Sequence, residues 1–319
     1  MYRLGIDLGG TNIAIGLCKD NKILDKATCP TVASRDNDEI IKDMACLAHK
    51  ILERNNLTNN DIEYVGIAAP GTVNSRTGII EYSNNIKMKN YPIVDAFKRY
   101  WGDVAVYIEN DANAAALGEA LAGAGKGAGS LIMITLGTGV GGGIIINRKI
   151  YPGGINTAGG ELGHTVIVAR GRPCTCGRLG CWEAYSSATA LTHATDEKIR
   201  ELKLKGIPSL LMDEERREGH TSARTAFNAM KRGDKYGQEL VNDYIYYLSV
   251  GITNMINIFQ PEIICIGGGV CNEGETLLRP LCEIISREQY TRDANRKTRV
   301  IAAMLGNDAG IIGAAALGK

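Results

Sequence analysis

The sequence has no excess of charge of either sign. Its 36 Lys and Arg residues stand against 35 Asp and Glu residues, and the formal net charge is +1. A protein that binds along a nucleic acid usually carries a basic excess that neutralises phosphates. The charge balance therefore argues against a nucleic-acid partner. With 45% hydrophobic and 22% charged residues, the composition is that of an ordinary globular protein.

Features of secreted and membrane proteins are also missing. The opening residues, MYRLGIDLGGT, contain neither the apolar core nor the small-residue cleavage site of a signal peptide. The uncharged stretch 127–147 is interrupted by seven glycines and two threonines, so it predicts a strand, a turn and a second strand rather than a membrane span. We expect a cytoplasmic protein without membrane contact. Its nine cysteines are then thiols or metal ligands, not disulfides.

Two common nucleotide-binding motifs are absent. No glycine loop is followed by Lys-Ser or Lys-Thr, as the P-loop requires. The run TLGTGVGGG leads into a predicted strand, whereas the dinucleotide fingerprint leads into a helix. Both a P-loop enzyme and a Rossmann dehydrogenase are therefore disfavoured.

Three other glycine turns are present: DLGGT at 7–11, TLGTGVGGG at 135–143 and GGGV at 267–270. Glycine lets consecutive backbone N–H groups approach an anion without an intervening side chain. Each turn taken alone could equally be a plain hairpin. Together they make phosphate binding the hypothesis to test.

The chain repeats one structural pattern. Residues 2–30 contain two apolar runs across a glycine turn and then a third strand, and residues 130–150 contain the same arrangement again. A chain of 319 residues is long enough for two cores. We predict an α/β protein with a small N-terminal domain at 1–115 and a larger domain at 116–302. A C-terminal helix at about 303–319 is expected to return to the first domain.

A cluster of soft metal ligands occupies one short segment. His164, Cys174, Cys176 and Cys181 follow the spacing H-x9-C-x-C-x4-C. Four protein ligands close a tetrahedral zinc site and leave no open position for a water nucleophile, so such a zinc is structural. Merely buried thiols are the simpler alternative, but the ligand spacing favours zinc.

Three carboxylates accompany these features. Glu161 and Glu183 flank the zinc segment, which would hold both rigidly, a suitable arrangement for binding vicinal hydroxyls. Asp111 stands where an apolar strand meets a helix, and ligand sites of α/β folds are common at such positions. It is the candidate general base. The alternative that Asp111 only caps the helix remains open.

The order of the three glycine turns resembles the nucleotide-binding framework of the sugar kinase, actin and heat-shock ATPase superfamily. GGELGHTVIVARGRPCTCGRLGCWEA, together with IENDANAA, further resembles the ROK family of repressors, uncharacterised frames and sugar kinases, particularly its bacterial glucokinases. The resemblance spans nearly the whole chain. It implies two ribonuclease-H-like domains that close on ATP across an interdomain cleft.

The resemblance also implies an activity, namely ATP-dependent phosphorylation of a hexose at its 6-hydroxyl, with glucose as the leading substrate. Asp111 would remove the proton of the C6 hydroxyl, and Asp7 would help to hold Mg²⁺ through water. Contacts to MgATP would come from Asp7, Gly9, Gly10, Thr11, Asn12, Gly137, Thr138, Gly139, Gly268 and Gly269. Contacts to the sugar would come from Gly71, Asn85, Asn110, Asp111, Glu161, His164 and Glu183. The zinc ligands would be His164, Cys174, Cys176 and Cys181.

Two alternatives accompany this reading. N-acetylmannosamine or another hexose could replace glucose, since Met88 stands where family glucokinases often carry tryptophan in the loop that borders the sugar. A sugar-sensing regulator is the other alternative. Only six residues precede Asp7, where repressors of the family carry a DNA-binding segment. The resemblance also suggests a homodimer or homotetramer.

Overall fold

The computed structural model describes residues 1–155, 157 and 159–318. Within these residues the chain divides into two compact units. The first unit comprises 1–133, 143–160 and the C-terminal segment from 303, and the second comprises 134–142 and 161–302. The boundary that we expect between residues 115 and 116 stays a prediction.

The first unit is built on a five-stranded sheet with the order β3-β2-β1-β4-β8. Its strands are β1 (Tyr2–Leu8), β2 (Asn12–Lys19), β3 (Lys22–Pro30), β4 (Ile62–Ala69) and β8 (Val106–Asn110). The first three strands pair antiparallel, as the meander around DLGGT predicts. β4 lies parallel to β1, and β8 lies parallel to β4.

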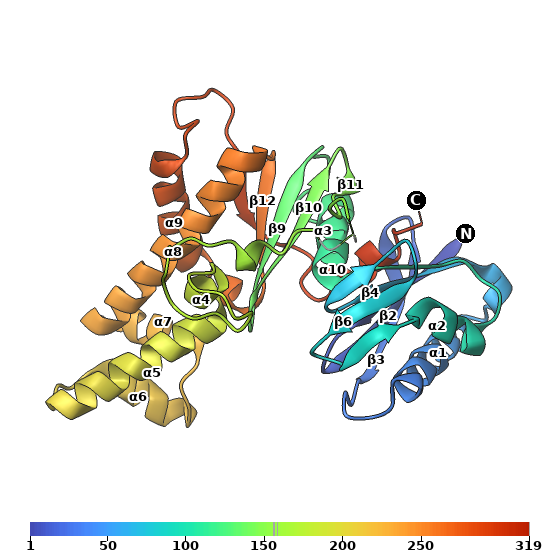
Figure 1. Cartoon of the computed structure of the whole chain (residues 1–319), viewed down its shortest axis with the longest axis horizontal. Coiled ribbons are helices and arrows are strands. Elements are labelled where there is room, and N and C mark those ends of the chain that lie inside the picture. Colours follow the sequence, from blue (N-terminus) through green and yellow to red (C-terminus); the bar gives the residue numbers. More distant parts are fainter. Residues whose placement is uncertain (156, 158, 319) are drawn as a thin grey trace. The chain divides into compact units, whose positions relative to one another are not determined.

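Helices cover both faces of this sheet (Figure 1). Leu4, Ile6 and Leu8 alternate along β1 and enter a core shared with α1 (Asn37–Arg54) and α2 (Ile93–Trp101). The residues between them face the opposite side, where α10 (Asp308–Ala314) packs together with α3 (Asp111–Ala122).

Small residues allow α10 to approach the sheet closely. A Cβ atom added to Gly66 would lie 1.8 Å from the carbonyl oxygen of Ala314, so no larger residue fits there. The tail helix is shorter than the predicted 303–319. It begins at Asp308 because Gly306, with φ +54°, is part of a turn, and Lys319 lies outside the described residues.

A small antiparallel sheet completes the first unit. It contains β5 (Thr72–Asn74), β6 (Ile79–Ser83) and β7 (Met88–Tyr91). Met88, at the start of β7, is fully buried in the core of this unit.

A second five-stranded sheet has the order β11-β10-β9-β12-β13. Its strands are β9 (Leu131–Leu136), β10 (Val140–Ile146), β11 (Lys149–Ile150), β12 (Ile263–Gly267) and β13 (Arg299–Ala302). Counted from its own first strand, this is the order of the first sheet. The predicted α/β class with two ribonuclease-H-like sheets is thereby confirmed.

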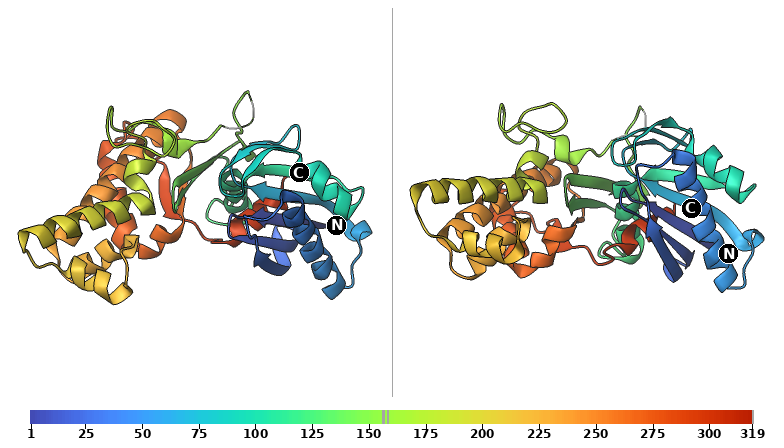
Figure 2. Two further views of the ribbon diagram at one scale, coloured as in Figure 1. Left: turned by 60° about the horizontal axis from the view of Figure 1, so that its bottom comes forward. Right: turned by 90° about the horizontal axis from the view of Figure 1, so that it is seen from below.

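The second unit carries most of its helices in one bundle. These helices are α4 (Glu183–Ser186), α5 (Ala188–Lys205), α6 (Leu210–Glu218), α7 (Ala223–Lys231), α8 (Lys235–Phe259) and α9 (Glu275–Glu288). α5, α6 and α7 stay together from every side in Figures 1 and 2, and α7 and α9 both contact α8. No helix among the described residues is both long and apolar enough to cross a membrane.

Candidate functional site

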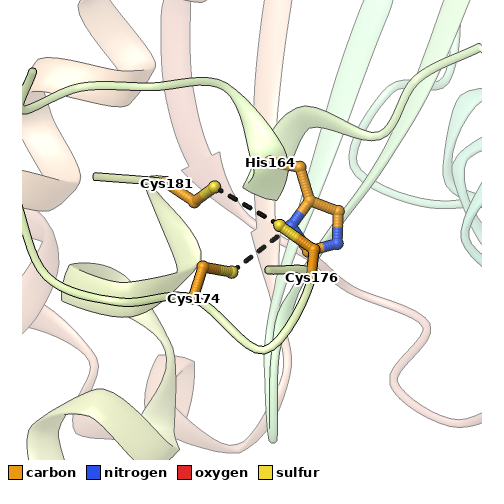
Figure 3. Close-up of side chains that lie close together, drawn as sticks. All are labelled: His164, Cys174, Cys176 and Cys181. Atoms are coloured by element: carbon orange, nitrogen blue, oxygen red, sulfur yellow. Dashed lines mark hydrogen bonds between the residues drawn. The ribbon is translucent and has the colours of Figure 1, made fainter. Parts of the chain in front are cut away.

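The four predicted metal ligands lie together in the second unit (Figure 3). Their ligand atoms all fall within 4.8 Å of one another. The Sγ of Cys174 is 3.7 Å from Nδ1 of His164, and the Sγ atoms of Cys176 and Cys181 are also 3.7 Å apart. In a tetrahedral site, Zn–S bonds of about 2.3 Å and Zn–N bonds of about 2.0 Å would place two sulfur atoms about 3.8 Å apart, and a sulfur and a nitrogen atom about 3.5 Å apart. The donor set therefore fits a closed zinc site.

Backbone contacts bring the two ends of this cluster together. His164 ends the 3-10 turn η2 (Leu162–His164), and Cys181 forms a β-bridge with Val166 just beyond it. The N–H of Trp182 donates to the carbonyl of Thr165 at 2.8 Å. Residues far apart along the segment thus surround one point.

The two glutamates that flank the cluster differ in their surroundings. Glu161 precedes η2 and is exposed. Glu183 begins α4 and is half-buried, and its Oε2 accepts a hydrogen bond of 3.0 Å from the N–H of Val140. Glu183 therefore contacts the glycine turn between β9 and β10.

Asp111 is the first residue of α3, directly after β8, as predicted. The helix cap, however, is Asn110, whose side chain accepts hydrogen bonds from the N–H groups of Ala112 and Asn113. Asp111 also accepts from the N–H of Ala112, at 2.8 Å. Capping is thus chiefly the role of Asn110, and the position of Asp111 is not explained by capping alone.

The carboxylate of Asp7 is close enough to Asp111 for the charge of Asp111 to change its pKa. Burial, and after it the charge of Asp111, raises the pKa of Asp7 in β1 from its ordinary 3.8 to about 6. Asp7 near the end of β1 and Asp111 just after β8, two strands that both lie parallel to β4, create a site of concentrated negative charge. Such a site suits a divalent cation or a proton-transfer step.

Predicted sugar-binding residues of the first unit contact one another and one of the predicted ATP-binding glycines. The side-chain amide of Asn110 donates to the carbonyl of Gly71 at 3.1 Å. Asn85 packs against Gly10, where an added Cβ would lie 3.2 Å from the Cβ of Asn85. The turn that contains Gly10 and Thr11 is closed by a 3.0 Å bond from the N–H of Gly9 to the carbonyl of Asn12.

In the second unit the two remaining glycine turns are adjacent. Gly268 follows β12 with φ +90°, and an added Cβ would lie 2.3 Å from the carbonyl oxygen of Leu136 at the end of β9. Glycine is required here both by backbone conformation and by space. Gly137, Thr138 and Gly269 all face one cavity.

This cavity lies wholly within the second unit and has a volume of about 650 Å³, which is typical of small-molecule sites. Its walls combine apolar and charged side chains. The lining residues are Leu136, Gly137, Thr138, Ala188, Glu218, His220, Ser222, Ala223, Arg224, Phe227, Gly269, Val270 and Glu273.

Sequence reasoning missed one wall of the cavity. The charges in the run 210–224 predict an exposed helix and linker. The structure contains this helix as α6 (Leu210–Glu218), with Arg216 and Arg217 exposed, but the run is not exposed throughout. Leu211 and Glu214 are fully buried, and the run supplies Glu218, His220 and Arg224 to the cavity. A run with so many charges is usually solvated, so its sequence did not indicate burial. Glu214 can be buried because it forms ion pairs with two arginines.

Comparison with known proteins agrees with this geometry. The ROK family model matches residues 3–319. A glucokinase of Halalkalibacterium halodurans is 38% identical over 314 residues, which cover 98% of this chain and 93% of that protein. The crystal structure of a ROK family glucokinase from Streptomyces griseus, in complex with glucose and AMPPNP, has a TM-score of 0.80 and 32% identity and covers 99% of both chains.

A xylose repressor of Caldicellulosiruptor bescii is also similar, at 30% identity, but the match covers 90% of this chain and only 70% of the repressor. The fold and the site thus define an α/β protein with two five-stranded sheets and a His/Cys cluster whose donor set fits zinc. The chain belongs to the ROK family, and it is similar to bacterial glucokinases over its full length.

Proposed function

We propose that the protein is an ATP-dependent hexose 6-kinase and that glucose is its preferred hexose. The proposal draws on the similarity to glucokinases over 98% of the chain, and on a structural relative that binds glucose and AMPPNP. The match to the xylose repressor covers only 70% of that repressor, whereas the match to the glucokinase covers 93% of that glucokinase. This difference makes a regulator the weaker candidate.

The observation that carries the proposal is the pair of acids at the ends of β1 and β8. Phosphoryl transfer needs a group that accepts the proton of the attacking hydroxyl and a cation that neutralises the phosphates. Asp111 is the proposed base, since Asn110 already caps α3. Asp7 is the proposed partner of Mg²⁺, which it would hold through water.

The cavity of the second unit is the proposed site of the nucleoside. Phe227, Val270 and Leu136 offer apolar surface to a base, and charged groups line the same space. The N–H groups of the turns at 137–139 and 268–269 are the proposed donors to phosphate oxygens.

Zinc, when bound by the four-residue cluster, would fasten its loop and would take no part in the chemical step. The loop would then present Glu161 and Glu183 to the sugar hydroxyls. His164 uses Nδ1 toward the sulfur atoms, which leaves Nε2 for a hydroxyl group.

The test is ADP release with MgATP, measured in parallel for glucose, mannose, N-acetylmannosamine, N-acetylglucosamine, fructose and allose. We expect the highest kcat/KM with glucose. Asp111→Asn should lower kcat by about 10² to 10⁴-fold, the scale of general acid–base catalysis. Its thermal unfolding should stay close to that of the wild type.

Three outcomes would contradict parts of this proposal. An undiminished rate for Asp111→Asn would remove this residue as the base. A faster rate with another hexose would change the substrate. No turnover with any sugar, together with specific DNA retention in a gel shift, would favour the regulator.

A further inference from the structure

The glycine turn between β9 and β10 is braced by the segment that follows the zinc cluster. The N–H of Ala188 donates to the carbonyl of Gly137 at 2.9 Å. The N–H of Val140 donates to Oε2 of Glu183 at 3.0 Å. One bond therefore reaches each end of the turn, and both come from residues 183–188.

Gly139 allows the carboxylate of Glu183 to lie directly against the backbone. A Cβ added to Gly139 would be 2.2 Å from Oε2 and 3.1 Å from Cδ of Glu183. Gly137 differs, because an added Cβ there would meet no atom within 4 Å. A side chain at 139 would thus displace the carboxylate of Glu183 from its present position.

The zinc segment fixes the direction of this carboxylate. Glu183 stands two residues after the ligand Cys181, and between them lies Trp182, which is fully buried. Thr175, between two other ligands, donates to Oε1 of Glu183 at 3.4 Å. One carboxylate oxygen thus faces the metal loop and the other faces the glycine turn.

We propose that Glu183 is a positioning residue for the nucleotide, in addition to its expected contact with the sugar. By accepting the N–H of Val140, it holds the 137–139 turn in the shape in which the turn receives phosphate. Nucleotide affinity then depends on Glu183 even when no sugar is present. This inference rests on the proposed function, namely that the 137–139 turn binds phosphate.

The experiment is isothermal titration of the full-length, zinc-loaded protein with MgADP in the absence of sugar. We expect Glu183→Ala to bind MgADP about tenfold more weakly, since a hydrogen bond to a charged group is lost and the turn is released. Glu161→Ala is the matched control, because Glu161 lies on the same loop but is exposed. Its sugar-free affinity for MgADP should equal that of the wild type.

Two further variants separate this role from a general loss of structure. The amide oxygen of Glu183→Gln can still accept the N–H of Val140, so this variant should keep most of the sugar-free MgADP affinity. Gly139→Ala pushes the carboxylate away, so it should weaken MgADP binding in the wild type and much less in Glu183→Ala.

Equal MgADP affinity of Glu183→Ala and the wild type would overturn the inference. Equal weakening by Glu183→Ala and Glu161→Ala would also overturn it, since loop disruption would then be the cause. If Glu183→Ala does not fold, Glu183→Gln provides the test. The inference would then be overturned if Glu183→Gln lost as much affinity for MgADP as it loses for glucose. A wild-type protein that binds no MgADP at all would instead contradict the proposed function itself.

Discussion

Replacement of Asp7 by asparagine should stabilise the protein while it weakens the proposed Mg²⁺ site. The pKa of Asp7 is raised from 3.8 to about 6, first by burial and then by the charge of Asp111. The folded protein therefore holds a proton at Asp7 more tightly than the unfolded chain does. As the pH rises from about 4 to about 6, the folded state must release this proton, and the free energy of unfolding falls.

The size of this effect follows from the shift. About two pKa units at about 1.36 kcal/mol each correspond to a penalty of about 3 kcal/mol once the pH exceeds 6. Asparagine carries no charge at any of these pH values. Asp7→Asn should therefore raise the free energy of unfolding by up to about 3 kcal/mol at pH 7.5, and by almost nothing near pH 4.

Urea unfolding without nucleotide or Mg²⁺ provides the assay. The chain has two tryptophans, Trp101 in the first unit and Trp182 in the second. In a Trp182→Phe background, fluorescence reports on the first unit, which contains Asp7. Asp111→Asn supplies the control, because removal of its charge should make the gain from Asp7→Asn smaller.

The reasoning would be refuted if Asp7→Asn were no more stable than its parent at pH 7.5. A gain of the same size at pH 4.5 and pH 7.5 would refute it as well, because a charge-dependent penalty must vanish as the carboxylate is protonated.

Three other perturbations test the structure. Glu119 is fully buried, and its carboxylate accepts hydrogen bonds of 2.7–2.9 Å from the backbone N–H groups of Ala124, Met304 and Leu305. In Glu119→Gln, an NH₂ group would face one of these N–H groups. This variant should lower the free energy of unfolding by about 2 kcal/mol in urea titrations. Gly268→Ala should weaken MgADP binding in calorimetry by at least tenfold, because its Cβ would collide with the backbone of β9. Cys176→Ser should lower the zinc content measured by atomic absorption and lower Tm in calorimetry, whereas Cys46→Ser, at an exposed cysteine outside the cluster, should change neither.

Several features of the fold could be predicted because they depend on short-range pattern. Apolar runs on either side of DLGGT and TLGTG specify two hairpins, and both are present. The zinc ligands lie within eighteen residues, so the chain can close around one metal without help from distant segments. The position of Asp111 at the start of α3 could be predicted because the sequence pattern changes from strand to helix at this residue.

Other features required distant residues to meet. The cavity combines the end of β9 with α7 and η3 (Gly269–Glu273), which are separated by up to 137 residues, from Leu136 to Glu273. The local hydrophobic pattern of a sequence does not show which distant segments will pack together. In the run 210–224, the charges indicated a solvated helix. Glu214 is nevertheless buried, and one of its two ion pairs, with Arg232 at the end of α7, forms only when the helices pack.

The sequence by itself determined the class of the fold, the zinc cluster and the likeness to sugar kinases, since each is encoded in residues that are close along the chain. Only the tertiary structure decided that Asn110 caps α3, that Asp7 feels the charge of Asp111, and that Glu183 holds the glycine turn. Asparagine and aspartate have similar preferences as caps, so their order in IENDAN cannot separate the roles. A shifted pKa and a braced turn depend on distances across strands and loops, which arise only when the chain is folded.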